Sequence, residues 1–285
     1  MGVLTFLARR FVAGETAADA VAAARRMNQR GIRGILDFLG EHVTSVEEAR
    51  TAVEEYIRLL DTISAAGVGA SISLKASQMG VLVSSDLCLD NLSRVAQHAA
   101  QSKNTVWLDM EESALTQKTI DVFERLRAKY PNVGLCLQAY LVRSGGDLDR
   151  LMREPLRVRL CKGAYKEPPE IAYATRRAVD GNYRMLAQKA IENIGRGVYP
   201  AFATHDRALI QEILERVHQN NIDPKSFEFE MLYGIENAYL ATLSQQGYQA
   251  KVYIPYGTHW LHYFMRRLRE RKENIYFLMR NIFRM

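Results

Sequence analysis

Several short apolar runs in this sequence end in charged or polar side chains of the kinds that enzymes use. Lys75 ends the run SISLK, and Asp109 and Glu111 follow VWL. The others at such run ends are Gln138, Arg159, Lys162, Thr204 and His205. Cationic side chains bind carboxylates, and carboxylates orient cations or transfer protons. Amide and hydroxyl side chains donate and accept hydrogen bonds. These residues form one active site if the fold brings the run ends together.

The most distinctive stretch is RLCKGAY, which begins at Arg159. Arg159 and Cys161 lie on one face of a predicted strand, because side chains alternate along a strand. An arginine inside a strand is costly unless it is paired, and Asp109 is the expected partner. Gly163 and Ala164 would let the backbone approach a ligand such as a phosphate or cofactor group. A purely structural ion pair inside the fold stays an alternative for Arg159.

A predicted helix near the C-terminus places Tyr263, Arg266 and Arg267 on one arc, at positions i, i+3 and i+4. Two guanidinium groups beside a tyrosine suit the capture of a carboxylate. More basic residues follow at Arg269, Arg271 and Lys272, and for those three we favour a solvated basic helix. For Arg266 and Arg267 both interpretations stay open.

Lys75 and the run ATHD each admit more than one role. Lys75 can cover the surface with its stem, form a Schiff base, or pair with a substrate carboxylate. Asp206 is expected to cap the helix that follows it. Thr204 and His205 are then expected to bind a ligand.

Strand-like and helical patterns alternate along the chain, which predicts a parallel sheet with helical crossovers. The strand-like runs are 35–40, 70–75, 105–110, 134–139, 157–162, 200–204, 227–232 and 251–255. The helical segments between and after them are 45–60, 86–101, 112–129, 148–153, 167–195, 206–219, 236–246 and 258–273. Eight such units predict an α/β fold, a (β/α)8 barrel in which the polar strand ends meet at one mouth.

An extra helix over 16–29 precedes the first strand, so we expect one barrel domain over residues 1–285 with residues 1–30 as an N-terminal helical extension. A Rossmann sheet would show G-x-G-x-x-G after an early strand, and an NTPase would show a P-loop; the sequence has neither. His259 and His262 lack the spacing of a zinc motif, so no metal is expected.

Composition favours an ordinary globular enzyme. The net charge of +6 is spread along the chain apart from the C-terminal cluster, so an acidic partner such as nucleic acid is disfavoured. The three cysteines, Cys88, Cys136 and Cys161, form no CxxC pair, which fits a reducing compartment. No apolar run is long enough to span a membrane. We expect a cytoplasmic protein, with peripheral membrane contact left open.

The motifs SLKASQMG, LDMEES, LCLQAYL, RLCKGAYKEP, FATHD, FEFEMLYG and YIPYGTHWLHYFMRRLRER resemble, in order, those of the proline dehydrogenase family. The resemblance runs from the second predicted strand almost to the C-terminus. The chain is too short for the form fused to an aldehyde dehydrogenase, and it is similar to the stand-alone bacterial form. Two departures are Cys161, where an apolar residue such as valine is expected, and Glu230, where glutamine is expected and to which no role is assigned.

The resemblance implies that FAD lies across the barrel mouth. Arg159 would lie near flavin N5, and Asp109 would be a catalytic residue that orients the lysine and arginine side chains. Cofactor contacts would come from Met110, Gln138, Arg159, Lys162, Gly163, Ala164, Thr204 and His205. Lys75, Arg266 and Arg267 would hold the proline carboxylate, and Tyr253 and Tyr263 would shape the pocket around the ring.

The implied reaction is hydride transfer from C5 of L-proline to flavin N5, which gives 1-pyrroline-5-carboxylate. It is the first step of proline catabolism to glutamate, with a membrane quinone as the implied electron acceptor. Two other hypotheses remain: a cofactor-free lyase that uses Lys75 as a Schiff base, and a basic barrel that binds an acidic partner. The residues predict no particular oligomeric state.

Overall fold

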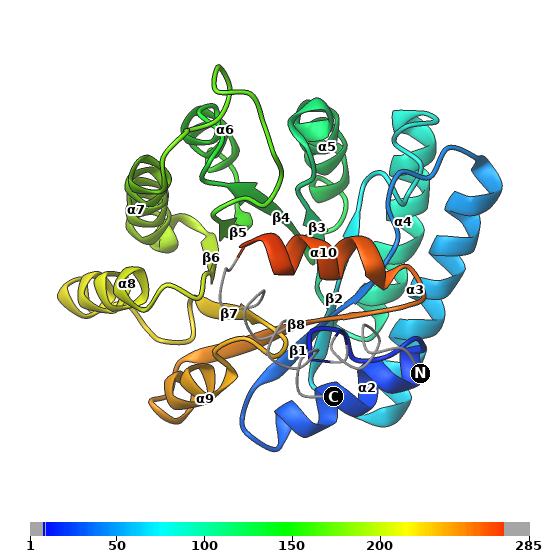
Figure 1. The fold of residues 1–285 in the computed structure, drawn as a ribbon, viewed down its shortest axis with the longest axis horizontal. Coiled ribbons are helices and arrows are strands. Elements are labelled where there is room, and N and C mark those ends of the chain that lie inside the picture. Colours follow the sequence, from blue (N-terminus) through cyan, green and yellow to red (C-terminus); the bar gives the residue numbers. More distant parts are fainter. Residues whose placement is uncertain (1–7, 9, 271–285) are drawn as a thin grey trace, which may run out of the picture.

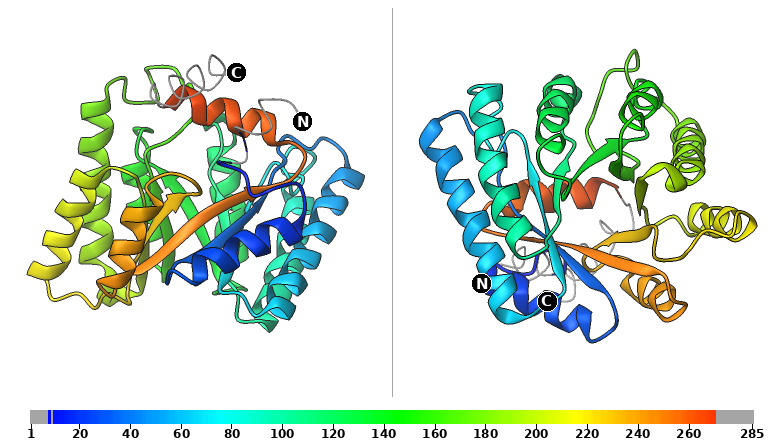
Figure 2. Two further views of the ribbon diagram at one scale, coloured as in Figure 1. Left: turned by 60° about the horizontal axis from the view of Figure 1, so that its bottom comes forward. Right: turned by 180° about the vertical axis from the view of Figure 1, so that it is seen from behind.

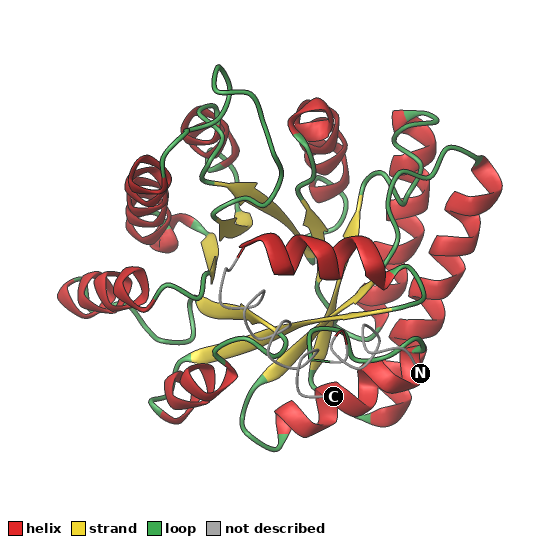
Figure 3. Ribbon diagram, in the orientation of Figure 1, coloured by secondary structure: helices red, strands yellow, loops and turns green. Residues whose placement is uncertain are grey.

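The computed structural model describes residue 8 and residues 10–270, which form a closed barrel of eight parallel strands (Figures 1 and 3). The strands are β1 (Arg33–Phe38), β2 (Ala70–Lys75), β3 (Val106–Asp109), β4 (Val133–Gln138), β5 (Leu156–Cys161), β6 (Val198–Ala203), β7 (Glu228–Leu232) and β8 (Gln249–Tyr256). β8 pairs with β1 to close the ring, so that Ile35 lies opposite Tyr253. The predicted (β/α)8 barrel is confirmed, and each predicted strand-like run overlaps a strand.

Helices follow the strands and surround the barrel. They are α2 (Ala17–Asn28), α3 (Val46–Ala66), α4 (Ser85–Gln101), α5 (Ser113–Arg127), α6 (Ser144–Leu151), α7 (Arg176–Glu192), α8 (Arg207–Gln219), α9 (Asn237–Gln245) and α10 (Trp260–Glu270). Ser45 caps α3 by accepting a hydrogen bond from the backbone of Glu48. The Asp206 carboxylate caps α8 in the same way, as predicted.

The start of α7 differs from the prediction, which placed it at Glu167. The helix begins at Arg176, after Thr175, whose hydroxyl accepts a hydrogen bond from the backbone of Ala178. The residues before it contain Pro168 and Pro169, which lack a backbone donor and disfavour helix in the preceding residue. The segment between β5 and α7 is therefore a loop, and in it Glu167 accepts hydrogen bonds from the backbone and the hydroxyl of Ser113.

The first and last described helices take different positions. Figure 1 shows α2 on the outside of the barrel, between α3 and α9, where it contacts β1 and β8 through buried residues that include Ala20, Ala24 and Met27. By contrast, α10 lies across the opening of the barrel (Figures 1 and 2). Phe264 of α10 packs against Phe11 of the N-terminal segment.

The predicted C-terminal basic run extends beyond the described part of the chain. Arg271, Lys272, Arg280 and Arg284 lie outside it, as do the side chains of Arg266 and Arg269 within α10. No helix in the described ranges is long and apolar enough to cross a membrane.

Alternation of side chains along each strand explains how polar groups come to lie inside the barrel. In β2, Ile72 and Leu74 belong to the apolar core between the strands and the helices. Ser73 and Lys75 point to the other side, into the barrel, where both are buried. The outer layer thus supplies the large hydrophobic core, and the inner face of the strands is left for polar groups near the mouth.

Candidate active site

A cavity of about 1150 Å³ opens at the carboxyl ends of the strands. All eight strands or the residues directly after them contribute to its lining, and α10 covers it with Tyr263 and Arg267. The predicted site residues that line it are Lys75, Asp109, Met110, Gln138, Arg159, Lys162, Gly163, Ala164, Thr204, His205, Tyr253, Tyr263 and Arg267. Arg266 is the remaining predicted residue, and its side chain lies outside the described part.

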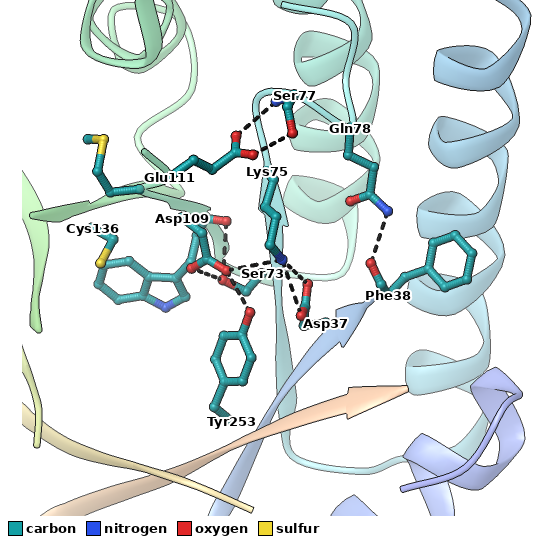
Figure 4. A network of polar contacts seen from close by, with 12 residues as sticks. Asp37, Phe38, Ser73, Lys75, Ser77, Gln78, Asp109, Glu111, Cys136 and Tyr253 are labelled. Atoms are coloured by element: carbon teal, nitrogen blue, oxygen red, sulfur yellow. Dashed lines mark hydrogen bonds and ion pairs between the residues drawn. The ribbon is translucent and has the colours of Figure 1, made fainter. Parts of the chain in front are cut away.

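Lys75 is buried in an ion pair rather than spread over the surface. Its Nζ atom donates to both carboxylate oxygens of Asp37, at 3.1 and 3.3 Å, and lies 3.9 Å from Oδ2 of Asp109 (Figure 4). The pKa of Asp37 is raised, mainly by burial and also by the negative charge of Asp109. The positive charge of Lys75 lowers this pKa but does not outweigh the other two effects. A lysine held between carboxylates suits an ionic contact better than Schiff-base chemistry.

Asp109 connects three strands at the centre of the site. Its Oδ1 atom accepts hydrogen bonds from Nη1 of Arg159 and from the Ser73 hydroxyl, both at 2.7 Å. Its Oδ2 atom accepts a hydrogen bond from the Tyr253 hydroxyl at 2.6 Å (Figure 4). The predicted pair between Asp109 and Arg159 is confirmed.

Arg159 is fixed on all sides inside the barrel. Its guanidinium carbon lies 4.6 Å from the ring centre of Trp107 and 5.6 Å from that of Tyr253. Its Nε atom lies 2.6 Å from Oε2 of Glu230. Burial lowers the pKa of Arg159, but Glu230 and Asp109 outweigh this and raise it above the ordinary value. The site therefore holds a permanent, immobile positive charge.

Glu230 is a site residue to which the sequence assigned no role. It is buried beside Arg159, which also pairs with Asp109, and it lines the cavity. Burial and the neighbouring Glu228 raise the pKa of Glu230 to about 8, although Arg159 lowers it. Glu228 is itself paired with Lys251 at 2.7 Å. Two glutamates two positions apart on one strand, FEFE, were the available signal.

The raised pKa of Glu230 predicts a stability difference that depends on pH. The folded protein binds this proton more tightly than the unfolded chain, so stability falls as pH rises from about 4.5 toward 8. Glu230→Gln removes the titration. We compare the free energy of unfolding of the variant with that of the wild type. When the pH is raised from 5 to 8.5, we expect this difference to shift in favour of the variant by on the order of 2–4 kcal/mol, since one pKa unit corresponds to about 1.4 kcal/mol.

Urea unfolding at the two pH values measures this difference. Glu215→Gln on the exposed side of α8 is the control and should show no comparable pH-dependent gain. An equal difference between Glu230→Gln and the wild type at both pH values would show that Glu230 does not titrate across this range.

Asp37 is the second residue that sequence reasoning missed. Asp37 is buried in β1 and pairs with Lys75. The signal was an aspartate inside the apolar run ILDFLG. A carboxylate there must be paired, because an isolated buried charge is costly.

Gln138 and Gly163 lie where β4 and β5 meet the cavity. Nε2 of Gln138 donates to the backbone oxygen of Met110 at 3.3 Å, and its Oε1 atom is buried with no hydrogen-bond partner in the described ranges. Gly163 has a φ of 109°, and a Cβ atom there would overlap the ring of Tyr140. Glycine is therefore required at this position by its own conformation and neighbour, apart from any ligand.

Lys162, Thr204 and His205 are already engaged in the structure. Nζ of Lys162 contacts Asp180 at 2.5 Å and Asp206 at 2.9 Å. The Thr204 hydroxyl accepts a hydrogen bond from the backbone of Asp206, and Nε2 of His205 accepts one from the backbone of Leu232. A ligand that binds these residues must share them with the contacts that hold the mouth together.

Tyr263 and Arg267 lie on one side of α10, as predicted for the last helix. The guanidinium carbon of Arg267 lies 5.2 Å from the ring centre of Tyr263, and both side chains are buried over the cavity. Lys75, Arg159 and Arg267 thus place three cations around one cavity, from two strands and a helix.

The chain is similar to a known protein family along most of its length. The family described as "Proline dehydrogenase" matches residues 20–280. Proline dehydrogenase 2 of Bacillus subtilis (strain 168) is 37% identical over 275 residues, which cover 96% of this chain and 90% of the relative. Proline dehydrogenase of Deinococcus radiodurans is 36% identical over 281 residues, 97% of this chain and 90% of the relative.

Among solved structures, proline utilization A from Bdellovibrio bacteriovorus superposes with a TM-score of 0.87 at 25% identity. The match covers 93% of this chain and 32% of that longer protein. The family match spans most of the chain, and the relatives are matched over nine tenths of their length. On this evidence the chain belongs to the proline dehydrogenase family.

Proposed function

We propose that this enzyme oxidises L-proline to 1-pyrroline-5-carboxylate with FAD bound in the cavity at the strand ends. Its family membership establishes the coarser part, an enzyme that acts on proline in the first step of proline catabolism. The observation that carries the finer part is the convergence of Lys75, Arg159 and Arg267 on one large cavity. FAD bound there would supply the hydride acceptor, its N5 atom, for the hydrogen on C5 of proline.

The residues present fit a flavin. The cavity of about 1150 Å³ is large enough for a cofactor and a small substrate together. Among the described residues, the buried Oε1 atom of Gln138 has no protein partner and could accept a hydrogen bond from a polar ring. The residues that would hold the cofactor are Met110, Gln138, Arg159, Lys162, Gly163, Ala164, Thr204 and His205.

Cations on opposite sides of the cavity would fix the substrate through its carboxylate. Lys75 would approach it from β2 and Arg267 from α10, with Tyr253 and Tyr263 forming walls around the ring. Arg266, whose side chain lies outside the described part, is proposed to join them from the family resemblance alone. Holding the carboxylate at several points orients the ring carbon that reacts, which is the proximity contribution to catalysis.

Arg159 would stabilise the negative charge that flavin reduction creates. Asp109 and Glu230 hold its guanidinium in place before the substrate arrives. A charge that needs no rearrangement during the reaction lowers the barrier more than a mobile one. Asp109 would act on the same reaction by orienting Arg159 and Lys75.

The visible spectrum of the purified protein tests the proposal. We expect bound-flavin absorbance, and we expect proline added without oxygen to bleach it. A colourless protein that does not bind added FAD would refute the proposal. Trapping of a carbonyl substrate on Lys75 with borohydride would support the lyase instead, although the contacts of Lys75 with Asp37 and Asp109 disfavour it.

The electron acceptor belongs to the same proposal. The family resemblance supports a membrane quinone, which implies a cytoplasmic enzyme with peripheral contact at the inner face of the membrane. Reoxidation of the bleached protein by a soluble quinone analogue under nitrogen measures this step. No reoxidation would exclude a quinone acceptor.

A further inference from the structure

A second cavity, of about 410 Å³, opens at the opposite, amino end of the barrel strands. We propose that it binds a compact polyanion carrying several phosphate or carboxylate groups. This floor site is defined by Arg33, Lys103, Arg157, Lys225 and Lys251. It lies apart from the residues that line the mouth, so it does not depend on the FAD proposal.

The charge around the floor site is of one sign. Besides Lys251, four cations, Arg33, Lys103, Arg157 and Lys225, line it, and within the described part of the chain no acidic residue does. A concave surface lined by one sign of charge concentrates the electric field and attracts the opposite ion. Its volume lies within the range of small-ligand sites.

These four cations also lack acidic partners. In the described ranges none of them forms an ion pair. Lys251, at the base of the cavity, is different, because it is buried and pairs with Glu228 at 2.7 Å. The Glu228 carboxylate is further occupied by the Tyr199 hydroxyl at 2.8 Å. Glu228 therefore neutralises Lys251 at the base, whereas in the described ranges no carboxylate neutralises the four other cations.

The side chains of the floor site favour a polar ligand over one with a large apolar body. The guanidinium carbon of Arg157 lies 4.7 Å from the ring centre of Tyr199, so the aromatic face there is already covered. Ser71, Asn104 and Gln249 add polar groups to the lining. Arginine and lysine bind phosphate and carboxylate oxygens through charge-assisted hydrogen bonds. These groups suit a ligand whose surface is mostly anionic oxygen.

Calorimetric titration of the full-length protein with inorganic pyrophosphate and, separately, with citrate tests the floor site. We expect at least one of them to bind the wild type, and the tighter of the two identifies phosphate or carboxylate as the preferred group. In the double variant Arg33→Gln/Lys225→Gln we expect the Kd of that probe to rise at least tenfold.

The double variant Lys118→Gln/Arg216→Gln removes the same charge from α5 and α8, outside the floor site, and its Kd should change less than twofold. Proline turnover should be unchanged in both variants, which shows that each is folded. Failure of both probes to bind the wild type would overturn the proposal. So would unchanged binding in the floor variant, or equal weakening in the control variant.

Discussion

Replacing Arg159 with methionine is expected to lower kcat for proline oxidation by two to three orders of magnitude. The variant keeps the side-chain volume but removes the charge proposed to stabilise the reduced ring, and the loss of one such group typically costs 10²–10³ in rate. It also leaves Asp109 and Glu230 without their shared cation. Breaking a buried pair of this kind destabilises a protein by about 3–5 kcal/mol.

Single-turnover bleaching by proline measures the rate of the Arg159→Met enzyme, and urea unfolding measures its stability. Arg159→Lys is the matched control, because it restores the charge without the planar contacts to both carboxylates. We expect it to recover part of the stability and part of the rate. A methionine variant with wild-type kcat would remove Arg159 from the proposed electrostatic role.

Replacing Arg267 with methionine is expected to raise the KM for proline by about 10- to 100-fold. A hydrogen bond to a charged group contributes roughly 1.5–3 kcal/mol, and its loss at the carboxylate weakens binding by that amount. Flavin absorbance should persist, because Arg267 lies on α10 over the cavity, away from the proposed cofactor contacts on the strands.

Steady-state kinetics over a wide range of proline concentrations measure the change at Arg267. Arg267→Lys should raise the KM less than methionine does, since it keeps a cation beside Tyr263. Arg216→Met on α8 controls for the general loss of positive charge. An unchanged KM in Arg267→Met would mean that this side chain does not bind the carboxylate.

Local patterns were enough to predict the barrel. Each strand is a short apolar run, and helix signals such as Ser45 and Asp206 mark where helices begin. The contact between Asp109 and Arg159 was also predictable, because an arginine inside a strand needs a carboxylate and Asp109 stands at the end of another strand of the barrel. The start of α7 was misplaced because two adjacent prolines were read as part of a helix.

Contacts between inward-facing side chains of different strands were not predictable in the same way. Asp37 reaches Lys75 because β1 pairs with β2, and Glu230 reaches Arg159 across β6. The order of residues along one sequence does not show which inward-facing residues meet across the interior. Both residues stand in runs that read as ordinary strands, so only the three-dimensional arrangement brings them into the site.

The position of α2 changes how the order of the barrel is understood. In a regular barrel the helix after the eighth strand covers the outside of the sheet, whereas here α2, which precedes the first strand, contacts β8 and β1. The helix before β1, α2, thus takes the place that the helix after β8 has in a regular barrel. The helix after β8, α10, covers the mouth instead. Residues 17–28 are thus part of the barrel wall rather than an appendage, and a chain that began at residue 30 would leave the β1–β8 seam open to water.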